Sequence, residues 1–402
     1  MKIQRTSGAS VQMMRAALYV MLALLLFAGC RAPQISEGPP AVGEVTSATP
    51  TATSTPLPPT PTVPPTATPS PTPTPSPTAT PTSTPTPTPT PPPTATPLPR
   101  PVATLNPGGV VGLGVYMPGV PYDDFASVMG FERSLKHKLE YVLWFQSWGD
   151  DPAFPGGYVL AATQRGLTPV ITWEPWKRNF ADPTAFQPEY SLQSIAAGEH
   201  DAYIRSWARG ARAAQVPIIL RFAHEQSTEP GARSWYPWQG DPDNYRAAFQ
   251  RIVTLFREEG ATNVRFLWSA MWLNGWADQY YPGDDYVDWV GTTVLNHGTG
   301  ATADWAKWRT FDDLFGGQYE AAVRWNKPVM ITEVASAEQG GDKAAWFRDA
   351  FAALPTRYPL VRGLLLLEVS SDREWPIINW SVSSSEESLA AFREGIGSGY
   401  FK

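Results

Sequence analysis

Eight short apolar runs, separated by stretches with helical periodicity, are the feature that most constrains how this chain can fold. The runs are rich in Val, Ile, Leu and Trp, which is typical of strands that are covered on both faces in a parallel sheet. Between two of them, residues 241–260 begin with an Asp, carry apolar residues at helical spacing and end with a Gly, as a complete helix does. The eight predicted strands are residues 110–117, 141–145, 169–173, 217–223, 264–270, 289–295, 328–334 and 363–369.

Eight strand–helix units in about 300 residues fit a closed barrel. The competing fold is an open doubly wound sheet, but neither a GxGxxG nor a GxxxxGK[ST] phosphate-binding turn occurs in the chain. We therefore predict an α/β fold, a (β/α)8 TIM barrel over residues 104–402. In such a barrel the functional residues lie at the carboxyl ends of the strands.

The first 30 residues resemble an export signal. Three basic residues precede an uncharged apolar run over 16–29, which is about the length of a signal-peptide core. The run ends in LFAGC, which is similar to a bacterial lipobox and makes Cys30 the expected site of lipidation. The alternatives are an ordinary secretory signal and an uncleaved anchor. In each case we expect an exported protein, either a membrane-anchored lipoprotein at the cell surface or a secreted one.

Residues 31–103 differ in composition from the rest of the chain. Residues 50–101 contain 22 prolines, mostly alternating with Thr, Ser and Ala, so we predict a disordered, extended linker. The remaining residues, 104–402, hold 26 basic and 35 acidic side chains, a net charge of −9. This acidic balance argues against a nucleic-acid partner. The single Cys excludes a disulfide within the chain.

Aromatic, carboxylate and amide side chains follow the predicted strands. A sugar-binding site needs this mixture, because pyranose rings stack on Trp while their hydroxyls hydrogen-bond to carboxylates and amides. The sequence therefore favours a polysaccharide as the partner. The strand-end residues are Gln146, Trp148, Trp173, Glu174, His224, Glu225, Trp268, Asn296, His297, Glu333 and Glu368.

Two of these carboxylates stand out. Glu225 and Glu333 each follow an apolar run, where a buried carboxylate is costly unless it has partners or a function. On the fourth and seventh strands they would meet across the barrel mouth, and a retaining glycosidase needs two carboxyl groups about 5 to 5.5 Å apart. The alternative is that either Glu is only an ion-pair partner, for example of Arg221.

Four ordered stretches resemble glycoside hydrolase family 26. They are residues 220–240 (LRFAHEQSTEPGARSWYPWQG), 243–269, 280–291 (YYPGDDYVDWVG) and 327–336 (KPVMITEVAS). The resemblance implies a retaining (β/α)8 enzyme, with endo-β-1,4-mannanase as the best-known activity of the family.

The same resemblance implies roles for individual residues. Glu225 would be the general acid/base and Glu333 the nucleophile, and Arg221 and His224 would orient them. The other residues that we expect to contact sugar are Trp173, Glu174, Trp235, Tyr236, Trp238, Trp268 and Asn296.

The chain departs from the family pattern at two strands. Many members carry a Tyr before the Asn that follows strand six, where this chain has Leu295 before Asn296, and the eighth strand lacks the usual aromatic platform. The predicted function is a retaining endo-β-glycanase, with mannan as the first substrate. The alternatives are a β-1,3-1,4-glucanase, an exopolysaccharide hydrolase and a carbohydrate-binding barrel without turnover.

The sequence shows no motif for a metal or cofactor. It has four His residues, none in an HExxH spacing, and no GxSxG elbow. We therefore expect no metal and no cofactor, and we expect a monomer.

Overall fold

The structure of the protein is a computed structural model that describes residues 110–228 and 234–402. The predicted signal peptide (1–30), the predicted linker (31–103) and the first residues of the predicted domain 104–402 lie outside the described residues, so those boundaries stay predictions.

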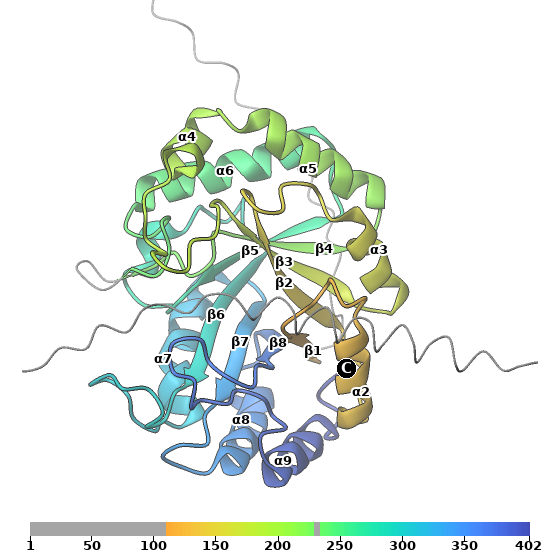
Figure 1. The fold of residues 1–402 in the computed structure, drawn as a ribbon, viewed down its shortest axis with the longest axis vertical. Coiled ribbons are helices and arrows are strands. Elements are labelled where there is room, and N and C mark those ends of the chain that lie inside the picture. Colours follow the sequence, from red (N-terminus) through yellow and green to blue (C-terminus); the bar gives the residue numbers. More distant parts are fainter. Residues whose placement is uncertain (1–109, 229–233) are drawn as a thin grey trace, which may run out of the picture. The chain divides into compact units, whose positions relative to one another are not determined.

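Eight parallel strands form a closed barrel in chain order, with β8 pairing back onto β1 (Figure 1). The predicted fold class is confirmed, and every predicted strand overlaps an observed one. The strands are β1 (Gly112–Tyr116), β2 (Tyr141–Ser147), β3 (Thr168–Glu174), β4 (Ile218–Phe222), β5 (Val264–Ala270), β6 (Trp289–Asn296), β7 (Val329–Ser336) and β8 (Val361–Leu367).

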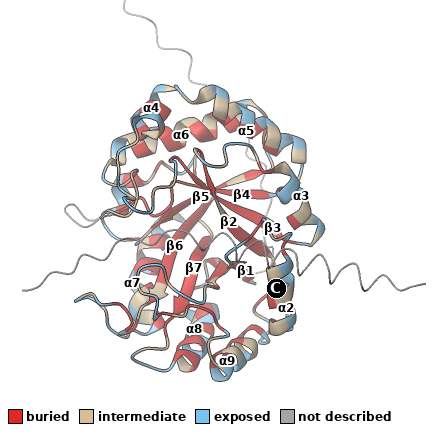
Figure 2. Ribbon diagram, viewed as in Figure 1, coloured by how far each residue is buried: buried red, intermediate tan, exposed pale blue. Residues whose placement is uncertain are grey.

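Helices surround the barrel, and the side of each helix that faces the barrel is buried (Figure 2). The predicted helix over 241–260 is observed as α6 (Pro242–Glu258), where the Asp241 carboxylate accepts a hydrogen bond from Asn244 N and Gly260 follows the end with a positive φ of 73°. Within the described ranges no helix is both long and apolar enough to span a bilayer. The other α-helices are α2 (Ala126–Leu135), α3 (Gly156–Gln164), α4 (Leu192–Ala197), α5 (Asp201–Ala214), α7 (Phe311–Ala322), α8 (Lys343–Arg357) and α9 (Glu386–Ile396), and short 3-10 helices cover Pro188–Tyr190, Ala277–Tyr280 and Val323–Trp325.

Strand residues alternate between two apolar cores. Along each strand, every second residue points into the barrel interior, and the residues between these pack against the helices. This is the two-residue period of a strand. The face on which a residue lies therefore decides whether it can reach the barrel mouth. The interior core consists of Tyr141, Leu143, Val170, Ile219, Leu267, Trp289, Met330 and Leu365.

Candidate active site

Glu225 follows β4 in a turn whose backbone is strained. Ala223 and Glu225 have φ values of 42° and 55°, which residues with a Cβ seldom adopt. Neighbouring strands hold the turn, because Ala223 N donates to Trp173 O at 3.0 Å and Glu225 N donates to Ser269 O at 2.8 Å. The Glu225 side chain reaches β6, where the Thr293 hydroxyl donates to its Oε1 at 2.5 Å.

The inward orientation of Glu333 results from an irregularity in β7. Met330 lies in the barrel interior, whereas Ile331 and Val334 both lie in the outer core. Under strict alternation Glu333 would share the outer face with Ile331. The register between β6 and β7 shifts just before Thr293 pairs with Glu333, which places one extra residue in β7. Such a bulge re-aims a side chain, and here it turns Glu333 toward the barrel axis.

One hydrogen-bonded network joins the two glutamates. The fully buried Arg221, on the inner face of β4, donates from Nη1 to Glu333 Oε1 at 2.9 Å. Thr293 pairs with Glu333 in the sheet and donates to Glu225, so all four side chains meet at one end of the barrel. The structure thus brings together the two carboxylates that the sequence singles out. Their catalytic roles stay predictions.

The two carboxylates differ electrostatically. Burial, reinforced by the nearby charge of Glu333, raises the pKa of Glu225 to about 7, against smaller opposing effects of Arg221 and Thr293. Glu333 instead has the Arg221 guanidinium as a direct partner. At neutral pH the pair can therefore hold one proton on Glu225, which is the arrangement of an acid beside an ion-paired carboxylate.

A wall of aromatic rings adjoins His224. Its Nε2 lies 3.1 Å from the Tyr236 hydroxyl, and its backbone carbonyl accepts from Trp238 Nε1 at 2.8 Å. The Tyr236 and Trp238 rings stack with centroids 4.7 Å apart. Burial, with the charge of Arg221, lowers the pKa of His224 well below its usual value, so the imidazole is neutral. Tyr236 is partly exposed at the site, and Trp238 supports it from a buried position.

The other two residues predicted near this wall also lie in the site region. Glu174, at the end of β3, is buried, contacts Arg178 at 3.3 Å and lies 3.9 Å from His224 Nδ1. Burial raises the pKa of Glu174 to about 7 in spite of Arg178. Trp235 is partly exposed beside Tyr236, and its backbone N donates to Gln239.

Two predicted sugar-binding tryptophans lie on the wrong face. Trp173 on β3 is fully buried in the outer core, with its ring 4.6 Å from that of Trp207 on α5. Trp268 on β5 is also fully buried in the outer core, 5.0 Å from Trp325. Successive residues of a strand point to opposite faces, and these two point toward the helices. Both rings therefore pack in the outer core, and neither contacts the barrel mouth.

Asn296 and Glu368 have structural partners. The Asn296 amide donates to Ser336 Oγ at 3.0 Å and accepts from the backbone of the following loop, at Gly298 N and Arg309 N. Glu368, after β8, accepts from the Ser381 hydroxyl and from Val382 N at 3.0 Å. Both side chains order loops rather than open into the mouth.

Sequence reasoning did not select two residues that belong to the site. Thr293 links the carboxylates, and Tyr116 at the end of β1 has its pKa raised by burial and by the charges of Glu333 and Glu174. The alternation of strand residues could have identified Tyr116, because Tyr116 shares the inner face of β1 with Gly112 and Gly114.

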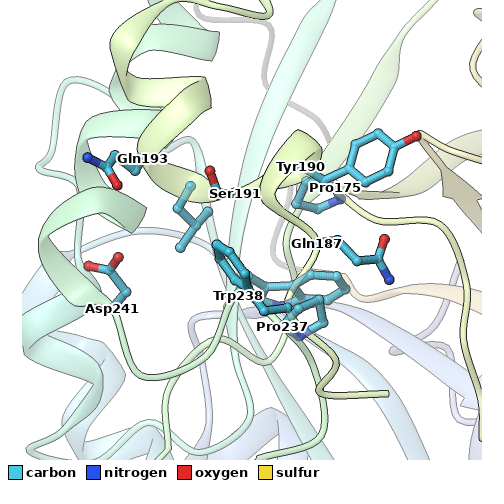
Figure 3. A pocket seen from close by; sticks show the side chains of 10 residues that line it. Pro175, Gln187, Tyr190, Ser191, Gln193, Pro237, Trp238 and Asp241 are labelled. Atoms are coloured by element: carbon cyan, nitrogen blue, oxygen red, sulfur yellow. The ribbon is translucent and has the colours of Figure 1, made fainter. Parts of the chain in front are cut away.

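A cavity of about 110 Å³ lies between the loop after β3, the start of α4 and residues 237–241 (Figure 3). Trp238, which supports Tyr236, lines it together with Tyr190 and Asp241. The cavity therefore adjoins the buried side of the aromatic wall at Trp238.

Two carboxylates at the mouth of a (β/α)8 barrel, one with a raised pKa and one ion-paired, beside partly exposed aromatic rings, are the arrangement found in O-glycoside hydrolases. Known proteins agree with this class. Residues 167–351 match the family model described as glycosyl hydrolase family 26. This match assigns residues 167–351 to glycosyl hydrolase family 26.

Two relatives and one solved structure are also similar to this chain. Endoglucanase H of Acetivibrio thermocellus is 35% identical over 286 residues, which cover 68% of this chain and 29% of the relative. A beta-1,3-xylanase of an Alcaligenes species is 22% identical over 213 residues, covering 48% of this chain and 43% of the relative. The chain thus spans less than half the length of these relatives. A Cellulomonas fimi endo-beta-1,4-mannanase double mutant shares the fold, with a TM-score of 0.52 at 18% identity over 73% of this chain and 72% of that one.

Proposed function

We propose that this protein is a retaining endo-β-glycanase in which Glu333 is the nucleophile and Glu225 the general acid/base. The observation that carries the proposal is the unequal pair at the barrel mouth: Glu225 has a pKa of about 7, and Glu333 is held by Arg221. A carboxylic acid and a carboxylate facing the same cleft are the two groups that hydrolysis with retention requires.

The reaction proceeds in two displacements. The Glu333 carboxylate attacks the anomeric carbon while Glu225 donates its proton to the glycosidic oxygen, so the C–O bond breaks and the leaving chain departs as an alcohol. Glu225, now ionised, removes a proton from water, and the hydroxide oxygen displaces Glu333 from the anomeric carbon. The first step leaves Glu225 ionised, as the second step requires, and the second step protonates it again.

The residues around the pair support these steps. Arg221 holds Glu333 by an ion pair to one oxygen. Thr293 donates to Glu225 and orients its carboxyl group. Tyr236, fixed by neutral His224, presents an aromatic ring and a hydroxyl beside the acid. A ring of this kind can stack against the pyranose on the leaving side.

For the substrate we propose a β-linked glucan, with mannan as the second candidate. The relative with 35% identity is by name an endoglucanase, and it is more similar to this chain than the mannanase that shares the fold at 18% identity. The four motifs of the family support mannan. Leu295 and the absence of an aromatic residue at the end of β8 change how the ring would be held, and that bears on the sugar rather than on bond cleavage.

The test is a reducing-sugar assay of the purified protein on lichenan, glucomannan, mannan and β-1,3-xylan, with Glu333→Gln and Glu225→Gln as variants. We expect the unmutated protein to release sugar from at least one substrate and both variants to lose that activity. Binding without turnover by the unmutated protein would contradict the proposal and support a carbohydrate-binding barrel.

We also propose that the protein is exported and anchored at the cell surface through a lipid on Cys30. The apolar run over 16–29 and the LFAGC sequence support this proposal. Expression of Cys30→Ala in a bacterial host should move the protein from the membrane fraction. If the variant fractionates as the unmutated protein does, the anchor is not at Cys30.

A further inference from the structure

An apolar rim lies next to the carboxylates at the ends of β6, β7 and β8. Leu295 follows Thr293 by two residues on the same strand and pairs with Ala335, which follows Glu333 by two. Two residues along a strand span about 7 Å. Leu295 and Ala335 pack in one cluster with Leu367, Ile378 and the rings of Trp375 and Trp380. The rim therefore begins within about one sugar length of the catalytic pair.

Three tryptophans surround a histidine on this rim. His297, directly after β6, has the rings of Trp305, Trp375 and Trp380 edge-on at 5.0, 5.3 and 5.0 Å. The Trp305 and Trp375 rings also meet edge-to-face at 5.6 Å. These tryptophans come from two loops, after β6 and after β8. His297 and Trp305 on the first loop thus both contact the second loop.

Contacts within the protein fix both loops. A Cβ at Gly298, next to His297, would lie 1.8 Å from Gln339 O, so only glycine allows this approach to the loop after β7. Asp372 accepts from Trp375 N and from Trp380 Nε1, each at 2.8 Å. A surface ordered in advance loses little conformational entropy when a ligand binds.

The cluster presents part of its aromatic surface to solvent. Trp380 is 1% exposed, whereas Trp305 is 49% exposed and Trp375 is partly exposed. A tryptophan normally buries its ring, and an exposed ring beside a sugar-cleaving site is suited to stacking on the C–H face of a pyranose.

We propose that Trp305 and Trp375 form a sugar-binding platform that holds a pyranose ring of the same β-linked polysaccharide chain that Glu225 and Glu333 cleave. The identity of the ligand rests on the proposed function. The platform supplies from the loops the aromatic surface that β8, which ends LLLL, does not carry. His297 positions the two rings and does not itself need to contact sugar.

Affinity electrophoresis of the full chain in gels that contain lichenan or mannan tests the platform. Glu333→Gln serves as the parent, because an inactive protein leaves the polysaccharide intact. Trp305→Ala in this parent should bind about two- to tenfold more weakly, the range that one aromatic contact contributes, and Trp305→Phe should restore most of the retardation. Tyr158→Ala is the matched control, since this aromatic residue is 38% exposed on α3.

The outcomes separate the platform from the proposed function. If Trp305→Ala is retarded as strongly as its parent, or if neither polysaccharide retards the parent, the platform is overturned. If Trp305→Phe fails to recover binding although its melting temperature matches the parent, stacking is not the role of Trp305. Loss of retardation in Trp305→Ala supports the platform even when the unmutated protein releases no sugar, an outcome that contradicts only the catalytic proposal.

Discussion

The two sides of the barrel mouth are built differently. Where β4, β6 and β7 meet, Arg221, Glu333, Thr293 and Glu225 form a continuous network of charges and hydrogen bonds. Beyond this network, at the ends of β6, β7 and β8, the rim consists of aliphatic and tryptophan side chains, and the buried Glu368 beside it orders a loop. In the proposed mechanism this contrast separates two tasks: the polar side moves protons and forms a bond, and the apolar side holds a ring in place.

Replacing the proposed nucleophile should have the largest effect. Glu333→Gln keeps the shape of the side chain but removes the attacking charge, so kcat should fall roughly 10⁴-fold or more. Reducing-sugar release measures this. Glu368→Gln is the control on the apolar side, because Glu368 is a buried glutamate that bonds to Ser381 and Val382 and should leave kcat within about threefold. Equal losses in both variants would contradict the division of tasks.

Replacing the acid/base should have an effect that depends on the leaving group. Glu225→Gln should lower kcat/KM on polysaccharide about 10²- to 10⁴-fold, because the departing sugar oxygen needs a proton. Aryl glycosides whose leaving group is a stable phenolate should be affected far less in their first step, which a burst of phenol would reveal. A loss of the same size for both substrates would mean that Glu225 is not the acid.

The buried lysine of the apolar side should affect stability rather than chemistry. Lys343 Nζ donates to Asn379 O, Ser381 O and Ser384 Oγ, at 3.1, 2.6 and 2.9 Å, and so fixes the loop that follows Trp375. Lys343→Met should lower the free energy of unfolding by about 2–4 kcal/mol, since these acceptors lose their donor. Chemical denaturation measures this, with exposed Lys307→Met as the control.

The pH dependence of that stability has a definite sign. Burial lowers the pKa of Lys343 to about 8 from 10.5, against the attraction of Glu338 and Glu368. Between these values the unfolded chain binds more protons than the folded one, so this group makes the protein more stable as pH rises from about 8 to 10.5. The rise should be absent in Lys343→Met. An identical pH slope in both proteins would contradict this assignment.

The smallest expected effect is a shift in the pH profile. With the pKa of Glu225 at about 7, kcat/KM should fall as pH rises above 7, because the acid loses its proton. The Thr293 hydrogen bond stabilises the ionised form, so Thr293→Val should raise the pKa of Glu225 and move the alkaline limb to higher pH. Thr292→Val is the control, since that hydroxyl bonds to Gln318 on α7. A shift to lower pH in Thr293→Val would contradict the network.

The barrel, and the presence of Glu225 and Glu333 together at its mouth, were predictable from the sequence because their signals are local. Apolar runs mark the strands, and Glu225 and Glu333 are carboxylates that follow such runs. Trp173 and Trp268 were assigned wrongly because closeness to a strand end does not give the face, and both rings point outward. Strand residues alternate between the two faces, so the position of each Trp relative to a residue of the barrel interior would have placed both rings on the outer face.

Other features depend on contacts that no local pattern reports. The extra residue in β7 breaks the alternation just before Glu333, so strict alternation would have placed this proposed nucleophile on the outer face of the barrel. The strained turn at Ala223 and Glu225 contains no glycine, so nothing in the sequence indicates its positive φ values. The contacts of Trp375 with His297 and Trp305 join residues 78 and 70 positions apart, and only the closed barrel brings them together.

The most direct test of the catalytic pair is to trap the glycosyl-enzyme intermediate. An activated 2-deoxy-2-fluoro glycoside slows the second displacement more than the first, so the sugar should remain attached to the protein. Mass spectrometry of the intact protein and of its peptides should find one added fluoro-sugar, esterified to Glu333. Attachment to another residue, or release of a product with inverted anomeric configuration and no adduct, would contradict the account.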